Sequence, residues 1–309
     1  MPTNQDVVAS QATLPSIDVR SRHGRKEAVA LADAALARGD FAQAEQLSRR
    51  VLQCDPDHAD AYAALQCALV EGGKLAAAVV VANRTLERFR ARNTESTQAY
   101  MLHVLQQRGF AFSGVLDIGA YEGEFSILAR QFFPNASVLM VEPQPQKRAG
   151  LDALASALGG DVQIESVLLG DEDCDGRAFH QLRTPFGSTG SSLYEELSDY
   201  PRDVLTLPMR RLDSLVRSHA GRTFDLVKID VQGAELDVLR GVGAMIQTVK
   251  ALCIELSLHP VNRGAPLLAE VVATLDQLGF AMSDAVPLPR DGGLQKQIDA
   301  VFVRKHALG

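Results

Sequence analysis

Residues 115–126 read VLDIGAYEGEFS, and this stretch decides the fold. A short apolar run ends near Asp117, a tight turn begins at Gly119, and a helix is expected to start near Gly123. Glycines at such a turn let the backbone adopt positive φ and pass close to a ligand. The stretch therefore predicts a strand, a ligand-binding turn and a helix, the order that opens a nucleotide-type cofactor site in α/β folds.

The glycine spacing of this turn argues against a dinucleotide cofactor. Dinucleotide-binding turns read Gly-x-Gly-x-x-Gly, whereas here Gly119 and Gly123 flank three residues and Tyr121 stands where the middle glycine would be. Glu122 and Glu124 would also repel a pyrophosphate at the start of the helix. Because acidic groups suit a cationic ligand, we expect the sulfonium and ammonium groups of S-adenosylmethionine here.

A second acidic position is Glu142, expected at the end of the next strand, 25 residues after Asp117. A carboxylate there can accept hydrogen bonds from both ribose hydroxyls, and Pro143 turns the chain off the sheet. Asp171, after the third strand, either accepts from an adenine amino group or belongs to a solvated acidic turn. The expected cofactor-binding residues are Asp117, Gly119, Ala120, Tyr121, Gly123, Phe125, Ser126, Glu142, Pro143 and Asp171.

From residue 115 onward, short apolar runs alternate with helical stretches. This alternation is typical of βαβ units around a buried parallel sheet, whose ligands bind beyond the carboxyl ends of the strands. The expected strands cover residues 115–118, 137–141, 163–169, 226–229, 251–256 and 300–303, and the expected helices cover 124–133, 147–158, 234–245 and 266–279.

The preceding part follows another pattern, a repeat of 34 residues over 24–91. Each unit reads as an amphipathic helix, a glycine break and a second helix, which resembles tetratricopeptide repeats. A generic pair of helical hairpins is the alternative. Two repeats bury little surface by themselves, so we expect them to bind a protein partner or a second copy of the chain. The matched pairs are Ala28/Tyr62, Leu31/Leu65, Ala35/Leu69, Gly39/Gly73, Phe41/Leu75, Ala44/Ala78 and Leu52/Leu86.

The sequence thus predicts three regions: a mobile leader over 1–23, tetratricopeptide-like helices over 24–93 and an α/β domain over 94–309. The chain carries 31 basic and 38 acidic side chains, a net charge of −7, and its acidic excess lies in the third region. A nucleic-acid partner is therefore not expected, because phosphate backbones are bound by basic surfaces.

Membrane and disulfide classes are also not expected. The longest apolar run, residues 75–82, is far shorter than the roughly 20 residues of a membrane helix. The first residues lack the basic and apolar segments of a signal peptide. The four cysteines, Cys54, Cys67, Cys174 and Cys253, form no C-x-x-C pair, so we expect reduced thiols and a cytoplasmic protein.

Several motifs together resemble the FkbM family of S-adenosylmethionine-dependent methyltransferases over about residues 94–309. They are DIGA (117–120), EP (142–143), SSL (191–193), LD (212–213), KIDVQGAE (228–235), Glu255 and DAVFV (299–303). The resemblance implies a Rossmann-like class I methyltransferase sheet of seven mostly parallel strands, the last antiparallel. It also implies methylation of hydroxyl groups on sugars, glycans or secondary metabolites. The chain departs from the family at Tyr121, where Asn is usual.

Methylation of an alcohol needs a base or a metal ion that removes the hydroxyl proton. The expected catalytic residues are Asp230, at the end of the fourth strand, Glu255 in the fifth strand, and His259 in the loop after it. Asp230 and Glu255 are also candidate ligands of a divalent cation. The alternatives are a helix N-cap for Asp230, a buried ion pair with Lys228 for Glu255, and an ordinary loop position for His259.

The stretch 184–193, rich in Gly, Ser and Thr, is expected to form either a lid that contacts a polyhydroxylated acceptor or a plain connection. Arg210 and Arg211 are expected to be solvated, or to contact an anionic part of the substrate. Two competing functions stay open. One is a catalytically silent platform whose helical repeats bind other proteins, and the other is a nicotinamide dehydrogenase, which the missing glycine disfavours.

Overall fold

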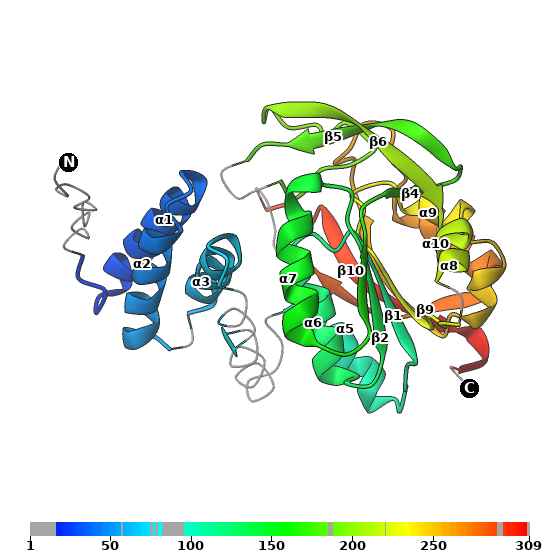
Figure 1. Cartoon of the computed structure of the whole chain (residues 1–309), viewed down its shortest axis with the longest axis horizontal. Helices are drawn as coiled ribbons and strands as arrows, with labels where there is room; N and C mark the ends of the chain where they lie inside the picture. Colours follow the sequence, from blue (N-terminus) through cyan, green and yellow to red (C-terminus); the bar gives the residue numbers. More distant parts are fainter. Residues whose placement is uncertain are drawn as a thin grey trace, which may run out of the picture. The chain divides into compact units, whose positions relative to one another are not determined.

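A computed structural model describes residues 17–56, 58–74, 77, 80–81, 96–184, 188–219, 221–288 and 293–307 (Figure 1). The chain divides into two compact units, Met1–Gly72 and Gly73–Gly309. Residues 1–16 of the leader expected over 1–23 lie outside the described residues, as does most of the stretch 75–95 with the boundary expected near residue 93. In the rest of that leader, Ile17 is buried in the core of the first unit and a helix begins at Arg22.

The described residues of the first unit form the helices α1 (Arg22–Ala37), α2 (Phe41–Cys54) and α3 (Ala59–Glu71). Alanines buried between them let the helices pack closely, around Leu47 and Val51. Gly39 and Gly73, matched in the repeat, both adopt left-handed φ, 74° and 72°, just after a helix ends. The partner helix that a second repeat needs lies mostly outside the described residues, so the tetratricopeptide assignment stays a prediction.

The second unit is built on a seven-stranded sheet in the order β3-β2-β1-β7-β8-β10-β9. Among the described strands of this sheet, β10 runs opposite to the others, which confirms the Rossmann-like arrangement and the antiparallel last strand. The strands are β1 (Gly114–Ile118), β2 (Ser137–Val141), β3 (Val162–Glu165), β7 (Leu226–Ile229), β8 (Ala251–Ser257), β9 (Phe280–Pro287) and β10 (Gln297–Arg304).

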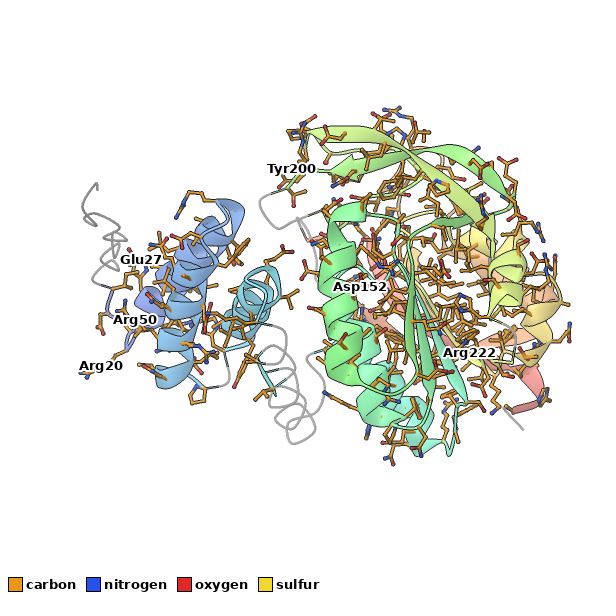
Figure 2. All side chains as sticks on the ribbon, in the orientation of Figure 1. Arg20, Glu27, Arg50, Asp152, Tyr200 and Arg222 are labelled. Carbon is orange, nitrogen blue, oxygen red and sulfur yellow. The ribbon has the colours of Figure 1, made fainter. Side chains whose placement is uncertain are left out.

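Helices cover both faces of this sheet, as Figure 1 shows. One face carries α5 (Thr97–Gln107), α6 (Glu124–Phe132) and α7 (Arg148–Leu158), and the other carries α8 (Leu212–Ser218), α9 (Glu235–Arg240) and α10 (Leu268–Gln277). Charged side chains such as Asp152 of α7 point outward (Figure 2). None of the helices in the described part of the chain is long and apolar enough to cross a membrane.

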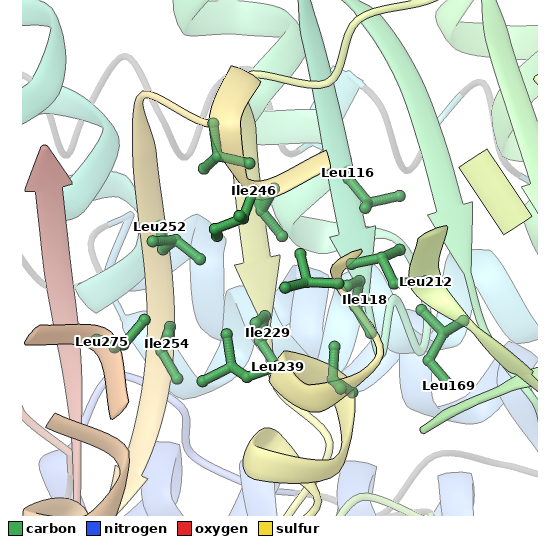
Figure 3. Close-up of a cluster of buried hydrophobic side chains, with 14 of the residues drawn as sticks. Leu116, Ile118, Leu169, Leu212, Ile229, Leu239, Ile246, Leu252, Ile254 and Leu275 are labelled. Carbon is green, nitrogen blue, oxygen red and sulfur yellow. The ribbon is translucent and has the colours of Figure 1, made fainter. Parts of the chain in front are cut away.

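The central strands of the main sheet are buried, although β1 carries Asp117 and β7 carries Lys228. All five residues of β1 and all four of β7 are buried, as expected for parallel strands covered on both faces. Figure 3 shows part of this core, where strand residues such as Ile118, Ile229 and Ile254 pack against Leu239 of α9 and Leu275 of α10. The core holds the strand ends at fixed positions, and those ends carry the candidate site.

One expected strand is wrong in its extent. Residues 163–169 are not a single strand: β3 ends at Glu165, and β4 (Leu168–Gly170) belongs to a second, three-stranded sheet in the order β4-β6-β5. The other strands of that sheet are β5 (Cys174–Leu182) and β6 (Arg202–Arg211). The chain leaves the main sheet after Glu165 and pairs with β6 from Leu168 onward, where Leu168 packs with Phe179 and Met209 of the second sheet.

Candidate active site

A cavity lies at the carboxyl ends of β1, β2 and β7 and opens to solvent; its empty volume, with the solvent space at its opening included, is about 660 Å³. The second sheet and the segment 188–193 form another wall. The polar or turn residues on the walls include Gly119, Tyr121, Glu142, Pro143, Gln144, Ser188, Thr189, Ser191, Ser192, Asp230 and Gln232.

Gly119 brings the ends of β1 and β7 into direct contact. Its φ is +75°, and a Cβ atom at this position would lie 1.9 Å from the carbonyl oxygen of Asp230. Its N–H donates to the carbonyl of Val141 at the end of β2, at 2.9 Å. Only glycine fits this position, and the turn leaves the backbone beside the cavity.

Glu142 follows β2 and is 3% exposed. Its Oε1 accepts the N–H of Gln144 at 2.9 Å and its Oε2 accepts the N–H of Tyr121 at 2.8 Å. Burial raises the pKa of Glu142, although these two backbone hydrogen bonds act against the rise. The Gln144 side chain also hydrogen-bonds this carboxylate. Because each carboxylate oxygen has two acceptor positions, one position is left for a hydroxyl donor in the cavity.

Lys228 joins the acidic residues of β1 and β7 beneath the cavity. Its Nζ donates to the carbonyl of Gly119 at 2.7 Å and lies 3.3 Å from Asp117 Oδ1 and 3.4 Å from Asp230 Oδ2. Burial by itself would lower the pKa of Lys228, but attraction to Asp230 and Asp117 outweighs it and raises the pKa. The ion pair considered for Glu255 is therefore made by Asp117 and Asp230 instead.

Asp117 and its neighbours in the loop lie below the cavity surface. Asp117 is fully buried, and the Ser126 hydroxyl donates to its Oδ2 at 2.7 Å. Phe125 is also buried, and Gly123 caps α6 with a φ of +81° against Leu154. Ala120 is buried and donates its N–H to Val141. These residues shape the turn from beneath, whereas Gly119 and Tyr121 line the cavity.

Asp230 lies at the mouth of the cavity with a side chain that is 25% exposed. Its Oδ1 accepts from Gln232 Nε2 at 2.7 Å, and the same nitrogen donates to Glu255 Oε1 at 2.7 Å. Asp230 does not cap the following helix, whose N-cap is Ala234. Lys228 and Gln232 thus hold one oxygen each of the Asp230 carboxylate.

A metal ion does not fit between Asp230 and Glu255. The amide nitrogen of Gln232 donates to both carboxylates, so a hydrogen-bond donor stands where a bridging cation would need oxygen ligands. In the residues that the structure describes, no group of three or more His, Cys, Asp or Glu side chains is arranged to hold a metal ion.

Two of the expected site residues lie on exposed parts of the described chain, outside the cavity lining. His259 is exposed in the loop after β8, and Asp171 is exposed after β4, where its carbonyl accepts from Arg211. Neither stands among the described residues that line the cavity. Arg210 pairs with Asp175 at 2.7 Å and Arg211 with Asp213 at 3.1 Å, so both guanidinium groups contact acids of the protein itself.

Tyr121 links the turn at Gly119 to the segment 188–193 through a hydrogen bond. Its φ is +49°, and its hydroxyl accepts the N–H of Ser188 at 3.3 Å. The ammonium of Lys147 lies 4.0 Å from the centre of the ring and also pairs with Glu122 at 2.6 Å. Burial raises the pKa of the Tyr121 hydroxyl, with the charge of Glu122 acting in the same direction.

Two residues that line the cavity have strained backbone conformations. Tyr121 and Gln232, with φ of 49° and 54°, are the two non-glycine residues with positive φ in the described ranges, and both line the cavity. Such conformations cost about 1–3 kcal/mol and cluster at functional sites. Gln144 and Phe179 also line it, yet neither was expected, because no local pattern distinguishes a wall residue from an ordinary turn or strand residue.

Comparison with known proteins gives one family match. The family model for the methyltransferase FkbM domain matches residues 117–282, more than half of the chain. A comparison with curated protein sequences found no match.

Similar solved structures include three proteins at low identity. Magnesium protoporphyrin IX methyltransferase from Synechocystis PCC 6803, with bound SAM, is 12% identical over 68% of this chain and 78% of that one, with a TM-score of 0.40. Precorrin-6y C5,15-methyltransferase from Geobacter metallireducens is 16% identical over 69% and 89%, with a TM-score of 0.40. Aeropyrum pernix fibrillarin, with natively bound S-adenosyl-L-methionine, is 13% identical over 67% and 76%, with a TM-score of 0.40.

Proposed function

The chain belongs to the FkbM family of S-adenosylmethionine-dependent methyltransferases, and we propose that it methylates a hydroxyl group of a sugar, a glycan or a secondary metabolite. The observation that carries the proposal is the pair of carboxylates in one cavity. Glu142 and Asp230 lie at the ends of β2 and β7, on either side of the turn at Gly119.

Glu142 is the residue proposed to bind the ribose of the cofactor. Its buried carboxylate is already oriented by two backbone N–H groups and has an acceptor position left for a ribose hydroxyl. The turn at Gly119 passes close to the cavity, so backbone atoms there can approach the cofactor. S-adenosylmethionine supplies a methyl group on a positively charged sulfur, and the two carboxylates make the cavity favourable for that charge.

Asp230 is the residue proposed to act on the acceptor. Its carboxylate accepts the proton of the acceptor hydroxyl as the oxygen bonds to the methyl carbon and the carbon–sulfur bond breaks, with the electron pair remaining on sulfur. Lys228 keeps the carboxylate near a positive charge, and Gln232 fixes its other oxygen. His259 was expected to share this role, but its exposed position after β8 supports Asp230 instead.

The experiment follows a labelled methyl group. Purified protein and methyl-labelled S-adenosylmethionine are incubated with a cell extract, and the labelled product is identified by mass spectrometry. We expect a methyl ether. A labelled amine, thiol or carbon product would contradict O-methylation, and a protein that binds no cofactor by calorimetry would contradict the function as a whole.

A variant of the proposed base separates binding from chemistry. Asp230→Asn should lower kcat by about 10²–10⁴-fold, the usual contribution of a positioned acid or base, while cofactor affinity changes little. Asp152→Asn, an exposed aspartate on α7, is the matched control and should keep the wild-type rate. Equal rates for the two variants would exclude Asp230 as the base.

We also propose that the N-terminal helices form tetratricopeptide-like repeats that bind a protein partner or a second copy of the chain, in the cytoplasm. The packed alanines of α1, α2 and α3 and the paired turns at Gly39 and Gly73 support this. Light scattering of the full chain and of a chain that lacks residues 1–72 tests self-association. Equal oligomeric states would exclude these helices as the contact between copies.

A further inference from the structure

Glu255 has no role in the proposed chemistry, yet it is a half-buried acid that contacts Gln232 of the cavity wall. It lies in β8, opposite Asp299 of β10 in the strand pairing, and neither stands among the described cavity-lining residues. An acid in this position requires another explanation. Its hydrogen bonds supply one.

Two amide groups converge on the same oxygen of Glu255. Gln232 Nε2 donates to Glu255 Oε1 at 2.7 Å, and Gln297 Nε2 donates to that oxygen as well. Gln232 Nε2 uses its other hydrogen on Asp230 Oδ1, also at 2.7 Å. The chain of contacts therefore runs from β10 through Glu255 and Gln232 to the carboxylate in the cavity.

Gln232 adopts an unfavourable backbone conformation at this link. Its φ of 54° is in the left-handed region, which is costly for a residue with a Cβ atom. Strain of this kind persists where the surrounding contacts determine the conformation. The amide, fixed between Glu255 and Asp230, is such a contact.

We propose that Glu255 is a positioning residue for Asp230, acting through the amide of Gln232. The inference rests on the proposed function, because it requires Asp230 to act on the acceptor. Glu255 fixes the side chain of Gln232, and Gln232 fixes the plane of the Asp230 carboxylate toward the acceptor. In this role Glu255 supplies an acceptor oxygen and exchanges no proton with the substrate.

The raised pKa of Glu255 agrees with the role of a hydrogen-bond acceptor. Burial raises the pKa of Glu255 well above its usual value, and the nearby carboxylates of Asp230 and Asp299 raise it further. A neutral carboxylic acid still accepts hydrogen bonds through its carbonyl oxygen. Glutamine offers the same oxygen at the same length, so it is the natural replacement for testing the role.

The test compares replacements that keep or remove the acceptor oxygen. Glu255→Gln should keep kcat within about threefold of wild type, whereas Glu255→Ala should lower it by about tenfold or more, because small displacements of a reacting group can cost up to about 10²-fold. The pH–rate profile of Glu255→Gln should keep the wild-type shape. If Glu255 took part in proton transfer, the Gln variant would be as slow as the Ala variant and would lose one limb of the profile.

A second pair of variants tests the amide link. Gln232→Asn should fold, because asparagine tolerates left-handed φ, but its shorter amide does not span both carboxylates. We expect kcat to fall by about 10–100-fold with cofactor affinity unchanged. Gln163→Asn is the matched control, since Gln163 bonds His219 at 2.8 Å on β3 and does not line the cavity. It should keep the wild-type kcat.

The outcomes separate this inference from the proposed function. A wild-type protein that transfers no methyl group to any hydroxyl overturns both. An active wild-type protein whose Glu255→Ala or Gln232→Asn variant keeps the full kcat overturns the positioning role alone, as does a Glu255→Gln variant as slow as Glu255→Ala. Cofactor titration and thermal unfolding of every variant show whether a lost rate comes from a lost fold.

Discussion

The two carboxylates of the cavity are held by different kinds of contact. Glu142, after β2, accepts two backbone N–H groups, from Tyr121 and Gln144. Asp230, after β7, is held by the side chains of Lys228 and Gln232. Backbone donors are present whatever the residue type, whereas side-chain donors are lost on substitution. We call the surroundings of Glu142 the β2 side and those of Asp230 the β7 side. The β2 side should therefore tolerate substitution of neighbouring residues, and the β7 side should not.

The largest loss of stability and of cofactor binding is expected for a substitution at Gly119, where the ends of β1 and β7 are in contact. In Gly119→Ala the added Cβ would lie 1.9 Å from the carbonyl oxygen of Asp230, so the ends of β1 and β7 must separate. We expect a loss of about 3 kcal/mol or more in the free energy of unfolding, because a steric clash adds to left-handed strain. Cofactor binding should also be lost. Denaturant unfolding and calorimetric titration measure both.

Gly109→Ala is the matched control for that change. Gly109 has a similar φ of +77°, but nothing lies within 4 Å of the added Cβ. It should lose only the left-handed cost of about 1–2 kcal/mol and should bind cofactor normally. Equal losses in the two variants would mean that contact between the strand ends is unimportant.

The next largest effect is a loss of cofactor affinity on substitution of Glu142. Glu142→Gln keeps the shape of the side chain but replaces a charged acceptor of the ribose hydroxyls by a neutral amide. Hydrogen bonds to charged groups contribute about 1.5–3 kcal/mol, so cofactor affinity should fall by about 10–100-fold, with kcat at saturating cofactor little changed. Calorimetry gives the affinity. The control is Glu165→Gln at the end of β3, which lies next to His219 and outside the cavity lining; an equal loss there would contradict the ribose role.

The β7 side should also show a pH-dependent stability. Burial, with the charge of Asp230, raises the pKa of Glu235 to about 7 although three backbone hydrogen bonds act against the rise. Because the folded state holds this proton to higher pH than the unfolded state does, the contribution to stability is present at acidic pH and is lost as pH rises through about 7. Urea unfolding between pH 5 and 8 should show this decline, and Glu235→Gln should flatten it. An unchanged slope in the variant would assign the decline to other groups.

The smallest effect is expected for the link between the turn and the segment 188–193. Tyr121→Phe removes the hydroxyl that accepts from Ser188 but keeps the backbone N–H that binds Glu142. One neutral hydrogen bond contributes about 0.5–1.5 kcal/mol, so the KM of the acceptor should rise by about 2–10-fold while cofactor affinity stays constant. Tyr200→Phe, at an exposed tyrosine labelled in Figure 2, should change neither constant. A rise in cofactor Kd for Tyr121→Phe would move the role of the hydroxyl to the cofactor.

The positions of the turn at Gly119 and of the acid after β2 could be predicted from local sequence. The turn at Gly119 and the acid at Glu142 follow short apolar strands, and parallel strands place their carboxyl ends at one edge of the sheet. Local spacing did not show which of these side chains line the cavity and which are buried beneath it. Asp117 and Phe125 belong to the expected loop but are buried beneath it, because a loop pattern does not tell which side chains turn toward the ligand.

The other side could be predicted only in part. Asp230 was expected from its strand end, but His259 lies in an exposed loop after β8 and Asp171 follows a strand of the second sheet. That sheet was missed because Leu168 and Leu169 look like the end of one buried strand, and only their pairing with β6 assigns them to the second sheet. Glu255 was expected as a catalytic or metal-binding acid, and its contact with the Gln232 amide could not be inferred from spacing.

The sequence by itself determined the alternating strands and helices, the glycine turn and the family, because each depends on residues that are close together in the chain. Only the tertiary structure decided which acids share the cavity and which lie behind it. One network of ion pairs and hydrogen bonds joins residues in or directly after β1, β7, β8 and β10. Its members are Asp117, Lys228, Asp230, Gln232, Glu255 and Gln297. Such contacts depend on the register and order of strands far apart in the sequence, which local patterns do not encode.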